Sequence, residues 1–82
     1  MIRAEVCVTL KRDVSDPQGN AICQALGSLG HSGLKSVRAG RFFEVMIDSD
    51  DPEKARADVE KMCDELLANT VIETYRIEVK KA

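Results

Sequence analysis

The stretch from Leu34 to Asp48, LKSVRAGRFFEVMID, decides how this chain can fold. It is rich in strand-forming residues, and only Arg41 interrupts the apolar residues at its odd-numbered positions: Val37, Ala39, Phe43, Val45 and Ile47. At about 3.3 Å per residue, a single strand of this length would extend roughly 50 Å, which is longer than a small domain is wide. Two arrangements therefore stay open. Either the chain turns or bulges at Ala39-Gly40-Arg41, or part of the strand projects and pairs with another subunit.

The even-numbered side of the same stretch carries Phe42 and Met46 beside Glu44 and Asp48. Apolar residues on a strand face that should be solvated indicate a contact surface. Scattered surface hydrophobes are also common, and this segment by itself favours neither interpretation.

Two elements are predicted before this stretch. From Ile2 to Lys11 apolar and polar residues alternate with a period of two. This pattern predicts a strand with one face that is exposed to solvent or to a partner. A helix is predicted from Pro17 to Leu29, with Gly30 in the left-handed conformation that ends it. One face of this helix is apolar: Ala21, Ile22, Ala25, Leu26 and Leu29.

Two further elements follow. A helix is predicted from Asp51 to Ala68, with one apolar face: Ala55, Val59, Met62, Cys63, Leu66 and Leu67. Val71 to Val79 is predicted to be the last strand, and its inward side chains should be Val71, Tyr75, Ile77 and Val79.

This order predicts one α+β two-layer domain over residues 1–82, with a mainly antiparallel sheet and two helices on one of its faces. A true turn at Ala39-Gly40-Arg41 would make the topology ferredoxin-like, β-α-β-β-α-β. Asp16-Pro17 and Asp51-Pro52 form a weak internal repeat, since each pair precedes a predicted helix.

Composition excludes several classes of protein. The net charge is −2 and only three aromatic residues could stack on bases, so a nucleic-acid partner is not expected. No apolar run is long enough to span a bilayer, and the N-terminus lacks the pattern of a signal peptide, so we expect no membrane partner and a cytoplasmic location. Three widely spaced cysteines indicate buried free thiols rather than disulfides or a zinc site.

Candidate catalytic groups are few. His31 is the only histidine and has no orienting partner nearby in the sequence. Acidic residues gather before the second predicted helix, where capping explains them better than a cation site: Asp48, Asp50, Asp51 and Glu53. We therefore predict no catalytic, cofactor-binding or metal-binding residue.

The turn DVSDPQGNA, from Asp13 to Ala21, precedes the first predicted helix and could be either an anion site or a helix start. Asp16 suits the N-cap and Pro17 suits the first helical position, so the helix start is favoured. A capping box formed by Ser15 and Gln18 is an alternative. Neither version explains Gln18-Gly19-Asn20.

With these features in place, the chain resembles the PurS family. VTLKRDVSDPQGNAICQALGSLG followed by VRAGRFFEV is similar to the N-terminal half of PurS proteins, and LLANTVIETYRIEV resembles the ending of the family. The resemblance extends from Val6 to Val79. Thr70 and Arg41 depart from it, since the family often has proline and lysine there.

The resemblance implies a single PurS-like domain without a catalytic centre, in the phosphoribosylformylglycinamidine (FGAM) synthase complex of purine biosynthesis. A glutaminase subunit would release ammonia, and a synthetase subunit would use ATP and magnesium, so no cofactor belongs to this chain. PurS proteins would form homodimers or dimers of dimers and would bridge these two subunits.

Contact residues follow as a hypothesis. Phe42 and Met46 would help to form the self-association surface. The turn Asp16-Pro17-Gln18-Gly19, together with Arg38 and Arg41, would contact the larger subunits. The alternative from another class is a ferredoxin-like regulatory module that binds a small molecule between paired domains.

Overall fold

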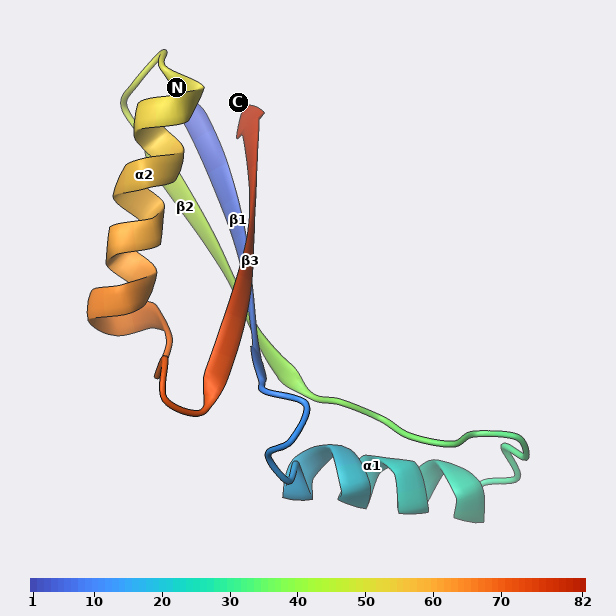
Figure 1. Ribbon diagram of the computed structural model, residues 1–82. Helices are drawn as coiled ribbons and strands as arrows, with labels where there is room; N and C mark the ends of the chain where they lie inside the picture. The colour runs from blue at the N-terminus through green and yellow to red at the C-terminus, as the bar shows by residue number, and fades with distance from the viewer.

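A computed structural model describes residues 1–82, and it contains three strands and two helices in the order β-α-β-α-β (Figure 1). The elements are β1 (Ile2–Leu10), α1 (Pro17–Ser28), β2 (Gly40–Ile47), α2 (Pro52–Met62) and β3 (Glu73–Lys81). β1 is the central strand and pairs antiparallel with β2 on one side and β3 on the other. The predicted α+β class with an antiparallel sheet is confirmed.

The hydrophobic core lies between one face of this sheet and α2. Alternate residues of β1 point inward and are fully buried: Ile2, Ala4, Val6 and Val8. α2 and the residues after it supply the opposite side of the core: Ala55, Val59, Cys63 and Ala68. The alternation of β1 therefore places one complete face of the central strand against α2.

The first helix does not take its predicted place. α1 lies away from the sheet and packs against no strand, so α2 is the only helix that covers the sheet (Figure 1). The reason is the chain before β2, which does not turn at Ala39-Gly40-Arg41 and leads directly into the strand. The hairpin is not formed, the sheet has three strands, and α1 is carried outward.

The molecule is consequently elongated. Its principal extents are 48 × 27 × 15 Å and its radius of gyration is 15.9 Å. A compact chain of this length would have a radius of gyration of about 12 Å. The excess comes from α1 and the connection between α1 and β2, which project from the end of the sheet.

Both helix starts are as predicted. The Asp16 side chain accepts a hydrogen bond from the Gly19 N–H, and Asp51 accepts from Glu53 and Lys54. A proline follows each cap in the first turn of its helix. Gly30, with φ of +99°, follows the last residues of α1 as expected.

The end of the second helix departs from the predicted pattern. Residues Cys63–Leu67 form a π-helical turn, which the Ala68 N–H closes by donating to the Cys63 carbonyl at 3.0 Å. The wider turn rotates Leu66 outward, and it is exposed rather than on the apolar face. Val71 is also 78% exposed, since it lies in the turn before β3 and not in the strand.

The difference between Val59 and Val71 can be tested with the same substitution at each position. Val59 is fully buried, so Val59→Ala should lower the free energy of unfolding by about 2–3 kcal/mol through lost burial and a cavity. Val71→Ala removes the same methyl groups from an exposed site and should change it by less than about 0.5 kcal/mol. Urea unfolding followed by circular dichroism measures both, and equal losses would contradict the observed core.

Candidate interaction surfaces

Asp16 ties the start of α1 to the residue before β2. Its Oδ1 accepts from the Gly19 N–H at 2.9 Å and its Oδ2 accepts from the Ala39 N–H at 2.8 Å. The side chain is only 5% exposed, and it is the one buried charged residue. These backbone hydrogen bonds, to Gly19 first and Ala39 second, lower the pKa of the Asp16 carboxyl because they favour its ionised form.

Arg38 reinforces the same junction from the other side. Its guanidinium donates to the carbonyls of Lys11 at 2.8 Å, Leu10 at 3.0 Å and Val14 at 3.3 Å. It therefore joins the end of β1 to the chain that enters β2. We call this junction the elbow, defined by Asp16, Gly19, Arg38 and Ala39.

The structure explains Gly19, one of the three residues of the DVSDPQGNA turn that the sequence left open. A Cβ atom at this position would clash with the Val37 carbonyl oxygen and would lie 2.7 Å from the Asp16 carboxylate. Only glycine lets the first turn of α1 approach the neighbouring chain this closely. The available signal was a glycine inside a predicted helix, where it lowers helix propensity without serving a turn.

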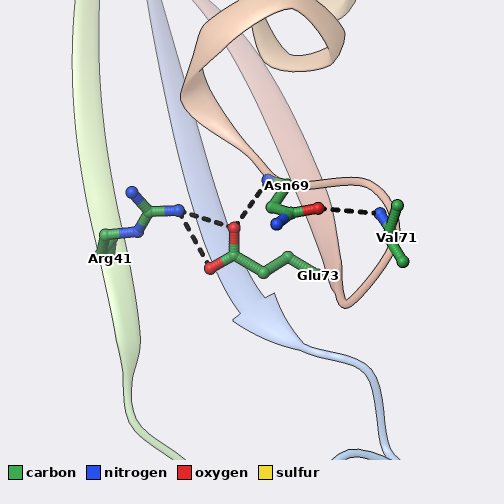
Figure 2. A network of polar contacts seen from close by, with 4 residues as sticks. All are labelled: Arg41, Asn69, Val71 and Glu73. Atoms are coloured by element: carbon green, nitrogen blue, oxygen red, sulfur yellow. Dashed lines mark hydrogen bonds and ion pairs between the residues drawn. The ribbon is translucent and has the colours of Figure 1, made fainter.

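Arg41 connects the two edge strands across the sheet. Figure 2 shows its guanidinium against the carboxylate of Glu73, with Nη2 donating to Oε1 at 2.7 Å and to Oε2 at 2.9 Å. Glu73 also accepts from the Asn69 N–H at 2.7 Å, and the Arg41 guanidinium lies 5.6 Å from the centre of the Phe43 ring. The positive charge of Arg41, at the start of β2, is thus paired with a carboxylate of the same chain.

The sheet face opposite α2 is open and mixed in character. Phe42 and Met46 are 58% and 52% exposed there. A shallow hollow of about 490 Å³ lies on this face, lined by Glu5, Cys7, Phe42, Arg76, Ile77 and Glu78. Apolar side chains at two positions of an edge strand, next to charged ones, are the composition of a contact surface.

The charges on this open face are organised across strands. Lys80 on β3 contacts Glu5 on β1 at 2.9 Å, and Arg3 lies 3.4 Å from the same carboxylate. The hydrogen bond from Lys80 is the main cause that lowers the pKa of Glu5, and that from Glu5 raises the pKa of Lys80. In the register of the sheet, Glu44, Glu5 and Glu78 stand side by side, so this face carries an acidic row.

The groups considered for catalysis lie apart. His31 is exposed in the turn after α1. Asp51 caps α2 and Asp50 pairs with the N-terminal amine at 3.6 Å, which agrees with the capping interpretation of the acidic cluster. No three histidine, cysteine or acidic side chains gather as metal ligands would, and neither helix has the length and apolar content to cross a membrane.

The structure separates the eight predicted contact residues into two sets. Asp16, Gly19, Arg38 and Arg41 make their contacts within the chain. Pro17, Gln18, Phe42 and Met46 are exposed, the first pair at the elbow and the second on the open sheet face. Arg38 and Arg41 are exposed as well, although their guanidinium groups have partners within the chain, whereas Asp16 and Gly19 are buried.

Fold and surfaces together define a class: a small α+β domain whose exposed features are contact surfaces on an antiparallel sheet and a projecting helix. Comparison with known proteins gives the family. The family model for phosphoribosylformylglycinamidine (FGAM) synthase, PurS, matches residues 3–81. The chain belongs to the PurS family.

Its relatives agree over nearly their full length. The chain is 43% identical to phosphoribosylformylglycinamidine synthase subunit PurS of Bacillus subtilis, covering 99% of this chain and 95% of that protein. It is 38% identical to the PurS subunit of Methanocaldococcus jannaschii, over 99% and 98% of the two chains. The family resemblance inferred from the sequence motifs is confirmed.

Solved structures agree as well. The crystal structure of M. jannaschii PurS superimposes with a TM-score of 0.91 and covers 100% of this chain and 99% of that one. A chain in the structure of PurLQS from Thermotoga maritima gives a TM-score of 0.85 at 28% identity, covering 98% and 99% of the two chains. The projecting position of α1 is thus compatible with the fold of its relatives.

The Asp16 carboxylate makes a pH-dependent prediction. Because its pKa is lowered in the folded chain, its contribution to stability is complete above the ordinary value near 4 and is lost as pH falls through the lowered one. Asp16→Asn should therefore be less stable than the wild type at pH 7, and the difference should shrink towards pH 2. Urea midpoints measured from pH 7 to pH 2 check this.

Asp13→Asn, at an exposed carboxylate of the same turn, is the matched control. Its urea midpoints should follow those of the wild type closely. A wild type and Asp16→Asn variant with the same midpoint at pH 7 would contradict the role of the elbow.

Proposed function

We propose that this chain is a non-catalytic, architectural subunit of FGAM synthase in purine biosynthesis. It bridges a glutaminase subunit and an ATP-dependent synthetase subunit, and it self-associates. Membership of the PurS family carries this proposal. The contact surfaces on a sheet face and at the elbow support it, since they suit binding to other proteins.

The physical task of such a bridge follows from the chemistry of ammonia. Ammonia released by a glutaminase into water is protonated and diluted before it can act as a nucleophile. Holding the two active sites in register keeps its path short and enclosed. ATP and magnesium belong to the synthetase partner in this proposal, and the cytoplasmic location expected from the sequence goes with it.

The two exposed residue pairs take different roles. Phe42 and Met46 contribute to self-association, because apolar side chains more than half exposed gain most from being covered. Pro17 and Gln18 lie on the outside of the elbow, which holds their backbone in a fixed position. A rigid, exposed turn loses little conformational entropy on binding, so these two residues are the proposed contact with a larger subunit.

Reconstitution from purified synthetase, glutaminase and this chain tests the bridging role. Glutamine-dependent FGAM formation should require all three proteins, whereas formation from added ammonium should need only the synthetase. Full glutamine-dependent activity without this chain would overturn the proposal. A rise in the melting temperature of the isolated chain with a free amino acid, and no partner requirement, would support the regulatory alternative instead.

One variant separates the elbow contact from general instability. Gln18→Arg places a bulky charge on the exposed turn and should weaken complex assembly by roughly tenfold, equivalent to about 1.4 kcal/mol. Gln24→Arg makes the same change on the exposed polar side of α1 and should assemble like the wild type. Analytical ultracentrifugation of the mixtures measures both, and equal assembly of the two variants would contradict this contact.

A further inference from the structure

Arginine and hydroxyl side chains from three parts of the chain meet at the end of the sheet beside the elbow. They line a hollow of about 460 Å³, formed by Thr9, Leu10, Arg12, Ser36, Arg38 and Thr74. The end of β1, the start of β3 and the connection into β2 converge there (Figure 1). We call it the basic hollow, because two of its lining residues are arginines and none is acidic.

Contacts within the chain bring these residues together. Thr9 on β1 stands opposite Thr74 on β3 in the register of the sheet. Arg38 donates to the carbonyls of Leu10 and Lys11, and so holds the connection into β2 beside the end of β1. The basic hollow is therefore built by the same hydrogen bonds that form the elbow, and a single chain supplies all of it.

The positive charge of the basic hollow has no matching carboxylate. The ion pairs of the chain include neither Arg12 nor Arg38. Asp16 and Glu73 lie nearby in the fold, but their carboxylates already accept hydrogen bonds from other groups. Asp13 is exposed and does not line the hollow. In a chain with a net charge of −2, this local excess of positive charge favours an anionic ligand.

The two guanidinium groups are prepared for binding in different ways. Arg38 is held by its three hydrogen bonds to carbonyls, and a guanidinium has more N–H donors than these bonds use. Arg12 is exposed and free to move onto a ligand. One fixed donor group lowers the entropy cost of binding, and the mobile one adds a second charge.

The rest of the lining indicates what else the ligand carries. Thr9, Ser36 and Thr74 supply hydroxyl groups, which both donate and accept hydrogen bonds. Leu10 is the only apolar residue of the lining, and no aromatic ring is present to stack on a base. The volume falls within the range of about 300–1,000 Å³ that is usual for small-molecule sites. A small ligand rich in hydroxyl groups fits this lining better than an apolar one.

We propose that the basic hollow binds a small sugar phosphate. Arg12 and Arg38 bind the oxygens of the phosphate monoester, and the hydroxyl groups of the lining bind the sugar. A phosphate monoester suits two arginines better than a carboxylate does, since it carries roughly two negative charges at pH 7 and three acceptor oxygens. The inference goes beyond the bridging role and does not depend on it.

An NMR titration of the full chain tests this site directly. Ribose 5-phosphate is the probe, and the ionic strength is kept constant because salt screens exposed charges. We expect a dissociation constant of about 1 mM or lower. Amide chemical shifts should change at residues 9–12, 36–38 and 74. Ribose should cause no change, and inorganic phosphate should bind more weakly than the sugar phosphate.

A matched pair of variants separates the site from general charge effects. Arg12→Gln removes a proposed phosphate ligand and should weaken binding of ribose 5-phosphate roughly tenfold. Arg76→Gln removes the same charge from an exposed position on β3 outside the lining, and should change the dissociation constant by less than about twofold.

A third variant tests the contact with the sugar. Thr74→Val keeps a β-branched side chain in the strand but removes the hydroxyl group. It should weaken binding of ribose 5-phosphate roughly fivefold and leave the affinity for inorganic phosphate unchanged.

Several results would overturn the proposal. These are the absence of shifts at the lining residues, equal losses in Arg12→Gln and Arg76→Gln, or equal affinities for inorganic phosphate and ribose 5-phosphate. Tighter binding of a tetraglutamate peptide would instead make the hollow a docking site for an acidic segment. The titrations contain no larger subunit, so failure here is distinct from failure of the bridging role.

Discussion

The Asp16 carboxylate is the contact on which the arrangement of this molecule depends. One carboxylate oxygen accepts a hydrogen bond from the first turn of α1, and the other accepts one from the residue before β2. A single side chain therefore holds together two parts of the chain that are 23 residues apart. Arg38 ties the same point to the end of β1. Without this junction α1 would have no defined direction, because it makes no other substantial contact with the sheet.

The small core is a consequence of this geometry. Only ten of the 82 residues are buried, and they come from β1, from the chain around α2 and from the elbow. A domain of this size has little apolar burial to set against the entropy of ordering its chain, so an uncovered helix and a partly covered strand are costly. The same elongated shape that weakens the single chain provides long surfaces for contact with other subunits.

The arginines at positions 38 and 41 have partners within their own chain. After the family resemblance, Arg38 and Arg41 were predicted to contact the larger subunits. In the folded chain their guanidinium groups satisfy backbone carbonyls at the elbow and the carboxylate of Glu73. Phe42, Met46 and Gln18 are exposed and carry no charge. Such groups cost less to desolvate than charges.

The sequence by itself determined which elements form and where both helices begin, because these depend on local chemistry. Alternation in β1, the Asp-Pro starts of both helices and Gly30 after α1 all follow from residues close in the chain. The PurS motifs likewise identified the family. The tertiary structure decided where α1 goes, that the chain does not turn at Ala39-Gly40-Arg41, and why position 19 is glycine. Each of these depends on contacts between residues far apart in sequence, such as Asp16 with Ala39 and Gly19 with Val37, and no local pattern reports them.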